Sequence, residues 1–162
     1  MQTPETLSMQ SNVQEYLEFI KNNSPELCLN ARLVYEITDC SYEEKMLTLT
    51  YKTTDWMLNP AGTVHGGMIC TMFDITMGIT SMAMSGTYTP TVNLAVSYLS
   101  PLPNNDKFVV KANATRVGKT FVQLTAEGWA ESTRTLCATA TAIFYCGAQQ
   151  KVVYRIEKKD EL

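Results

Sequence analysis

The sequence predicts an α+β fold in which an antiparallel sheet of about six strands wraps around one long central helix. Residues 65–84 form a single apolar stretch with helical spacing, and strand-like runs lie on both sides of it. Helices and strands that are segregated along a chain pack as separate layers, so the sheet is expected to cover this helix. The chain has 162 residues, of which 45% are hydrophobic, and this suffices for one such domain.

The first third of the chain predicts one short helix and two strands. Apolar residues at helical spacing indicate a helix from Ser11 onward, after a frayed start. Alternating apolar residues predict strands over 27–38 and 46–52. Residues 55–64 contain Asn, Pro and Gly, so we expect a loop there.

The central helix is expected to be buried, because apolar side chains cover most of its circumference. They recur at steps of three or four residues, at Met68, Met72, Ile75, Ile79 and Met82. Turn-forming residues at 86–90 are expected to end the helix.

Four strand-like runs follow the helix. They cover residues 91–99, 107–116, 120–131 and 135–146, and residues 152–156 are expected to add a short edge strand. The predicted organisation is an N-terminal extension with a short helix over 1–25, the sheet-and-helix domain over 26–147, and a charged tail over 148–162.

Charge and cysteine content narrow the function classes. The net charge of −3 disfavours a nucleic-acid binder, and the polar residues within 66–84 disfavour a membrane span. Five cysteines without a C-x-x-C spacing, beside a single histidine, predict reduced thiols and no metal site, as expected for a cytoplasmic protein. The first residues lack a signal-peptide pattern, so the final Lys159–Leu162 is interpreted as charged tail, not as a retrieval signal.

Asp74 is the first candidate for chemistry. It is the only acidic residue between Asp55 and Asp106, and it stands in the middle of the apolar helix. Burying a lone carboxylate is costly unless it is paired or used. Two interpretations stay open: a functional carboxylate, or a structural one that lies at a subunit interface or bonds a neighbouring Thr.

Gly66 and Gly67 begin the helix and leave backbone N–H groups uncovered at the positive end of its dipole. This arrangement suits an oxyanion site, although a tight turn packed on the sheet is equally compatible with two glycines. Gly66 and Asp74 are eight residues apart, which is roughly 12 Å along a helix at about 1.5 Å per residue. If both act on one carbonyl, they must come from two subunits of a two-fold dimer with antiparallel helices.

The pattern Asn59-x-x-Gly62-x-x-His65-Gly66-Gly67, followed by Asp74, resembles that of the hot-dog-fold acyl-CoA thioesterases, in their phenylacetate-pathway (PaaI-like) branch. Residues 91–101 and 116–120 resemble two further segments of that branch, so that the resemblance covers about residues 30–146. It implies a hot-dog fold, in which a curled antiparallel sheet encloses the long helix, and assembly as a homodimer or homotetramer.

The resemblance also implies a role for each site residue. Asp74 would be the catalytic carboxylate, acting as a general base on water or as a nucleophile that forms a mixed anhydride. The Gly66 N–H would polarise the thioester carbonyl, and Asn59 would help to position that carbonyl or the water. His65 would orient Asn59 or the loop, and Thr91 would hold the lytic water.

Two groups of residues are expected to bind the acyl-CoA, and no cofactor is expected because coenzyme A enters as part of the substrate. The group at the helix consists of Gly67, Met68, Phe73 and Met77. The group at the turn, where cations could meet the phosphates, consists of Arg116, Gly118 and Lys119.

Two other functions stay open at this point. A hot-dog hydratase or dehydratase needs a histidine paired with a second acid, and His65 is the only histidine. A non-catalytic acyl-CoA-binding module would act through an attached DNA-binding domain, and one short N-terminal helix is too little for a helix-turn-helix.

Overall fold

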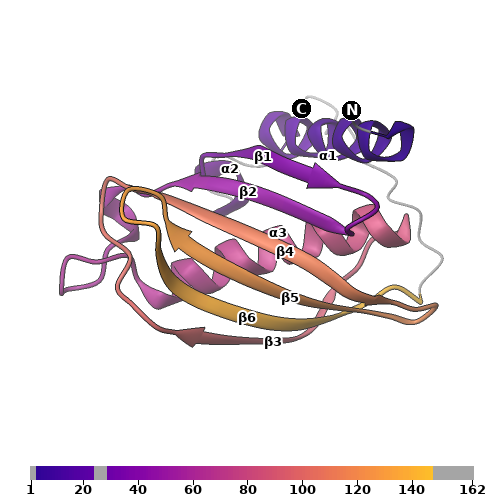
Figure 1. The fold of residues 1–162 in the computed structure, drawn as a ribbon. Coiled ribbons are helices and arrows are strands. Elements are labelled where there is room, and N and C mark those ends of the chain that lie inside the picture. The colour runs from indigo at the N-terminus through magenta and orange to yellow at the C-terminus, as the bar shows by residue number, and fades with distance from the viewer. Residues whose placement is uncertain (1–2, 24–28, 148–162) are drawn as a thin grey trace, which may run out of the picture.

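The computed structural model describes residues 3–23 and 29–147, and the elements follow one another along the chain as Figure 1 shows. The helices are α1 (Pro4–Asn23), α2 (Leu29–Arg32), a 3-10 turn η1 (Asp55–Met57) and α3 (Gly66–Ser85). The strands are β1 (Tyr35–Ser41), β2 (Met46–Lys52), β3 (Thr91–Tyr98), β4 (Lys107–Val117), β5 (Phe121–Ala130) and β6 (Thr135–Tyr145).

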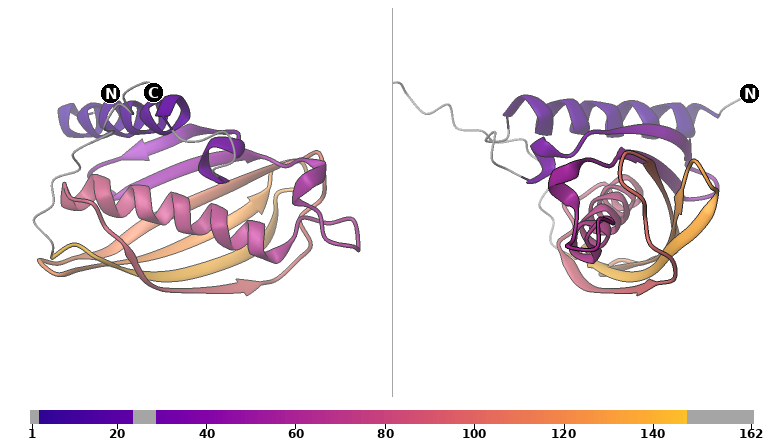
Figure 2. Two further views of the ribbon diagram at one scale, coloured as in Figure 1. Left: turned by 180° about the vertical axis from the view of Figure 1, so that it is seen from behind. Right: turned by 90° about the vertical axis from the view of Figure 1, so that its left-hand side faces the viewer.

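All six strands form one antiparallel sheet in the order β1-β2-β4-β5-β6-β3. The sheet curls around α3, which runs along its concave side, as the view down the helix in Figure 2 shows. This arrangement confirms the predicted hot-dog architecture of a curled sheet and one central helix. It leaves β1 and β3 as the two edge strands.

Side chains of α3 fill the space between the helix and the sheet. Met72, Phe73 and Met77 have no exposed surface, and Phe73 meets Phe108 of β4 edge to face. The buried Tyr51 hydroxyl lies 2.8 Å from the Thr76 hydroxyl and donates to the Met72 carbonyl, which satisfies these two hydroxyls. Within the described residues α3 alone is long and apolar enough to cross a bilayer, but half of it is buried inside the fold. We therefore interpret α3 as a core helix.

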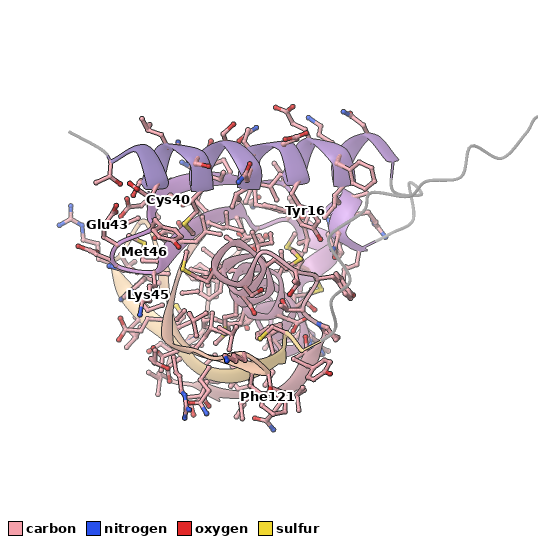
Figure 3. All side chains as sticks on the ribbon, turned by 90° about the vertical axis from the view of Figure 1, so that its right-hand side faces the viewer. Tyr16, Cys40, Glu43, Lys45, Met46 and Phe121 are labelled. Atoms are coloured by element: carbon pink, nitrogen blue, oxygen red, sulfur yellow. The ribbon has the colours of Figure 1, made fainter. Side chains whose placement is uncertain are left out.

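The N-terminal helix is longer than the sequence indicates, since α1 begins at Pro4 and not at Ser11. Its start is held by the turn between β1 and β2 (Figure 3), where Glu43 accepts hydrogen bonds from the hydroxyls of Thr3 and Thr6. These bonds lower the pKa of Glu43 to about 2. The first residues of the chain are polar, and a polar terminus usually frays. The residue that holds them in place, Glu43, lies far along the chain, so the local sequence pattern does not reveal it.

The strand predicted over 27–38 is wrong in its first half. Residues 29–32 form the short helix α2, and the strand begins only at Tyr35 and continues through Ser41. The apolar residues that alternate in this segment belong to two different elements. One part lies in a helical turn and the other in an edge strand, and Leu33 is buried between them. The edge strand predicted at 152–156 and the charged tail over 148–162 lie outside the described residues, as does the boundary near residue 25.

Gly128 on β5 is required by the packing of two aromatic rings, and we predict that alanine destabilises the fold there. A Cβ at this position would lie 2.2 Å from Cζ of Phe108 and 3.0 Å from Cζ of Phe73. Gly128→Ala should lower the free energy of unfolding by about 1–3 kcal/mol, measured by urea denaturation. The exposed neighbour Glu127 provides a control, since Glu127→Gln should leave stability nearly unchanged. Equal stability of both variants would contradict this account of the core.

Candidate functional site

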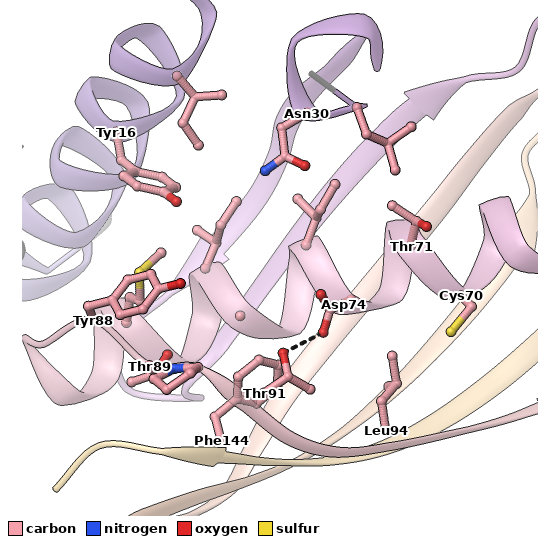
Figure 4. Close-up of a pocket in the computed structure, with 17 residues that line it drawn as sticks. Tyr16, Asn30, Cys70, Thr71, Asp74, Tyr88, Thr89, Thr91, Leu94 and Phe144 are labelled. Carbon is pink, nitrogen blue, oxygen red and sulfur yellow. Dashed lines mark hydrogen bonds between the residues drawn. The ribbon is translucent and has the colours of Figure 1, made fainter. Parts of the chain in front are cut away.

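Asp74 projects from the middle of α3 into a cavity of about 500 Å³ (Figure 4). The helices α1 and α2 form one wall, α3 forms another, and the segment 88–91 with β3 and β6 closes the third side. Most of the wall away from Asp74 is apolar, with Ile20, Ile79, Met82 and Phe144 among the lining residues. A half-buried carboxylate therefore faces a space large enough for a small organic group.

Thr91 holds the carboxylate of Asp74. Its hydroxyl donates to Oδ1 of Asp74 at 2.7 Å, the contact drawn as a dashed line in Figure 4. Thr91 reaches Asp74 because the chain turns back after α3. Gly86 caps the end of the helix in the left-handed conformation, and β3, which begins at Thr91, then pairs antiparallel with β6. Among the described residues no group bonds Oδ2 of Asp74, so this oxygen can accept a proton or attack a carbon in the cavity.

The start of α3 presents one uncommitted backbone donor. His65 is the N-cap residue, and its Nδ1 accepts the Gly67 N–H at 2.9 Å. The Gly66 N–H has no acceptor among the described residues, while the Gly66 carbonyl accepts the Tyr98 hydroxyl at 2.8 Å. A separate cavity of about 330 Å³, the helix-start cavity, opens here and is lined by Asn59, Gly66 and the end of β3. The geometry suits binding of a carbonyl oxygen at the helix N-terminus.

Asn59 shapes the loop before the helix. Its Oδ1 accepts the N–H of Ala61 at 2.9 Å, and its Nδ2 donates to the Thr63 hydroxyl at 2.9 Å. No hydrogen bond joins Asn59 to His65 among the described residues. His65 instead fixes the loop through two hydrogen bonds. Its backbone N–H donates to the Met57 carbonyl, and its Nδ1 accepts the Gly67 N–H. Of its two predicted roles, the geometry favours orienting the loop.

The structure brings Asp74 and Thr91 together but keeps Gly66 apart from them. Both Asp74 and Gly66 belong to one continuous helix, about 12 Å apart along its axis, and they open into different cavities. Within one chain the Gly66 N–H and the Asp74 carboxylate therefore cannot reach the same carbonyl group.

Several residues predicted to bind substrate lie elsewhere. Phe73 and Met77 point into the core without exposed surface, because they lie on the face of α3 toward the sheet, whereas Cys70, Asp74 and Gly78 lie on the face toward the cavity. Gly67 is exposed at the helix start, and Met68 packs partly buried against the core. Neither lines the cavity around Asp74.

The residues predicted to meet the phosphates, Arg116, Gly118 and Lys119, lie at the turn between β4 and β5. The Gly118 N–H closes this turn on the Phe121 carbonyl, and none of the three lines either cavity. Their part in binding stays a prediction.

Sequence reasoning missed the wall opposite Asp74. Tyr16 and Ile20 of α1, with Leu29 and Asn30 of α2, line the cavity from that side (Figure 4). Tyr16 and Ile20 are four residues apart and therefore lie on one face of the helix. Their spacing indicates that this face is buried, but it does not indicate which part of the fold the face covers.

Cys70 stands one helical turn before Asp74 and also lines the cavity. Burial, and secondly the charge of Asp74, raises the pKa of this thiol, which therefore stays protonated at neutral pH. Within the described residues no group of three His, Cys, Asp or Glu side chains is placed to hold a metal ion.

The family model of the thioesterase superfamily matches residues 61–137, a segment that contains Gly66, Asp74 and Thr91. This segment of the chain is therefore similar to the thioesterase superfamily. The acyl-coenzyme A thioesterase THEM4 of Mus musculus is 36% identical over 85 residues, which make up 51% of this chain and 35% of the mouse protein. The chain thus matches about a third of the length of that relative.

Solved structures agree on the fold. A phenylacetic acid degradation-related protein of Ralstonia eutropha JMP134 is 27% identical with a TM-score of 0.70, covering 82% of this chain and 98% of its own. The smu.793 protein of Streptococcus mutans UA159, solved with bound acetyl-CoA, is 22% identical with a TM-score of 0.66, covering 73% of this chain and 92% of its own. The predicted resemblance to hot-dog thioesterases of the PaaI-like type is confirmed.

The cap at the start of α3 gives a prediction for His65. His65→Ala removes the acceptor of the Gly67 N–H and should destabilise the helix start by about 1 kcal/mol. His65→Asn keeps a capping acceptor and should retain most of this stability. Hydrogen exchange at Gly67 measures the effect directly: faster exchange is expected in the Ala variant only. Exchange at the wild-type rate in His65→Ala would show that the imidazole does not cap the helix.

Proposed function

We propose that this protein hydrolyses acyl-coenzyme A thioesters to a free acid and coenzyme A. The observation that carries the proposal is the Asp74 carboxylate, held at one oxygen by Thr91 and free at the other, in a cavity with mostly apolar walls. The similarity to THEM4, an acyl-coenzyme A thioesterase, supports the reaction, and the acetyl-CoA bound to the smu.793 protein supports the ligand class.

The chemistry follows from two groups. The Gly66 N–H, at the positive end of α3, donates to the thioester carbonyl and stabilises the negative charge that develops on its oxygen. Asp74 Oδ2 then acts in one of two ways. As a general base it takes a proton from water while that water attacks the carbonyl carbon, and the coenzyme A thiolate leaves and is protonated. As a nucleophile it forms a mixed anhydride, expels the thiolate, and is regenerated when water cleaves the anhydride.

We propose further that each complete site combines Gly66 of one subunit with Asp74 of the other. The distance of about 12 Å along α3 requires this if both groups act on one carbonyl. The edge strand β3 supports a partner on that side of the sheet, because no strand of the described residues pairs with its outer edge, which carries the exposed side chains of Val92 (57%) and Tyr98 (54%). The assembly is then a homodimer, or a homotetramer made of two such dimers.

Other parts of the proposal concern binding and location. Arg116 and Lys119 would meet the phosphates of coenzyme A, with Gly118 allowing close approach of the backbone. Coenzyme A is part of the substrate, and no separate cofactor is invoked. The free thiols of the four described cysteines support a reducing compartment such as the cytoplasm.

Of the two rival functions, the hydratase fits the geometry less well than hydrolysis. A hydratase would need His65 as a base beside the substrate, but its Nδ1 is engaged in capping α3, nine residues before Asp74. Hydration of a 2-enoyl-CoA, followed by absorbance, would favour that rival. An acyl-CoA-binding module predicts tight binding by calorimetry without release of thiol.

The role of Asp74 predicts the effect of removing its charge. Asp74→Asn keeps an oxygen that can accept the Thr91 hydroxyl but can neither take a proton nor attack a carbon. The kcat for acyl-CoA hydrolysis, measured by thiol release, should fall by a factor of about 10² to 10⁴ while the melting temperature stays similar. Glu36→Gln, an exposed carboxylate on β1, is the matched control and should retain full activity. Activity of Asp74→Asn near the wild-type level would end the proposal.

The role of the Gly66 N–H can be tested with proline, which lacks that donor. Proline is well tolerated at the first helical position, and the extended backbone of His65 suits a following proline. Gly66→Pro should lower kcat by a factor of about 10² to 10³. Gly66→Ala is the control: it adds the same Cβ, 3.2 Å from Cζ of Tyr98, but keeps the N–H. If both variants lose activity equally, crowding against Tyr98 explains the loss and the donor does not.

A further inference from the structure

A groove between α1 and α3 continues beyond the cavity of Asp74. A second cavity of about 210 Å³ lies along it, lined by Asn12, Val13 and Tyr16 of α1 and by α3 up to Gly86. The two cavities share three lining residues, Tyr16, Ile79 and Met82. The helices run antiparallel here, since Ile20 lines the first cavity with Ile75 whereas Val13 lines the second with Gly86.

Tyr16 stands at the boundary between these two cavities. In Figure 4 its ring extends from α1 toward α3, at the end of the first cavity away from Cys70. Ile79 and Met82 face it from α3. Of the three shared residues Tyr16 is the only aromatic one and the only one from α1, so its ring forms the partition from that side.

The partition is fixed because α1 is firmly docked. Thr6 is buried and donates to Glu43 at 2.6 Å, and it also accepts the Tyr42 N–H at 3.0 Å. Met9 and Val13 belong to the hydrophobic core, and Ile20 is nearly buried at the far end of the helix. A wall anchored at both ends can set a length limit, whereas a loose helix would yield to a longer ligand.

Resting on the proposed function, we propose that Tyr16 sets the maximum length of the acyl group. With the thioester carbonyl at Asp74, the acyl chain runs along α3 toward Met82, between the apolar side chains of Ile20, Ile79 and Phe144. The face of α3 along this path carries Ile75, Ile79 and Met82, which suits the methylenes of an acyl chain. The ring of Tyr16 stops the chain before the second cavity.

The distances along the helices give the expected length. Asp74 and Met82 are eight residues apart, or roughly 12 Å. An extended acyl chain advances roughly 1.25 Å per carbon, given a carbon–carbon bond of about 1.52 Å, so about nine or ten carbons fit before the partition. Tyr16 and Asn12 are four residues apart on α1, and opening the partition therefore adds roughly 6 Å, or about four to five carbons.

The test is the chain-length profile of hydrolysis. We compare kcat/KM for saturated acyl-CoAs from acetyl to palmitoyl in the wild type and in Tyr16→Ala. The variant should raise the ratio of kcat/KM for myristoyl-CoA over decanoyl-CoA by at least about tenfold, because methylenes that enter an apolar pocket contribute strongly to specificity. Tyr16→Phe keeps the ring and should leave the profile unchanged, as should the exposed neighbour variant Glu15→Ala.

A second variant distinguishes an opened partition from a loosened helix. Ala83 lines the second cavity but not the first. Ala83→Leu fills that space, so it should leave the wild-type profile alone and cancel the gain of Tyr16→Ala in the double variant. If Tyr16→Ala does not fold, Tyr16→Leu makes the same comparison with a side chain that favours helix and stays apolar.

Two negative results would lead to different conclusions. A folded Tyr16 variant with an unchanged ratio overturns the inference while wild-type hydrolysis still supports the proposed function. If the wild type hydrolyses no acyl-CoA, the proposed function fails. Calorimetric binding of decanoyl-CoA and myristoyl-CoA to the same variants then decides whether Tyr16 limits ligand length: a preference shifted toward myristoyl-CoA in Tyr16→Ala supports it, and an unshifted preference overturns it.

Discussion

The continuity of α3 is the constraint on which the rest of the site depends. Without a break from Gly66 to Ser85, the helix holds an uncommitted N–H at its start and a carboxylate in its middle at a fixed separation. The sheet locks the helix in place through buried residues such as Met72, Phe73 and Met77, which pack against the strands. A rigid helix cannot bend to bring these two groups together, so within one chain they cannot act on the same carbonyl group. The edge strand β3 runs past both groups, since Thr91 at its start bonds Asp74 and Tyr98 at its end bonds Gly66.

The sequence predicts those features that depend on local pattern. The apolar periodicity of residues 65–84 and the alternation after Thr91 define the central helix and four strands to within one or two residues. Asp74 and the glycines at the helix start are visible because a charge within an apolar helix, and bare amides at its end, are locally unusual. The contact between Thr91 and Asp74 follows once the helix and the next strand are placed side by side.

The features that the sequence does not predict depend on distant contacts. The early start of α1 rests on Glu43, and the cavity wall at Tyr16 and Asn30 rests on how α1 and α2 dock over α3. Phe73 and Met77 illustrate the same limit: helical spacing identifies apolar residues, but only the position of the sheet decides which of them face the core and which face the ligand. The N-terminal segment therefore changes from a polar extension into a wall of the candidate site.

The shared site between two subunits is the central claim, and mixing two defective variants tests it most directly. Gly66→Pro and Asp74→Asn subunits are each expected to be inactive alone. After subunit exchange, half of the dimers are mixed and each contains one intact site, so activity should return to about a quarter of the wild-type level. If the mixture stays as inactive as its components although mixed dimers form, the two groups do not serve one carbonyl across an interface, and the account is contradicted.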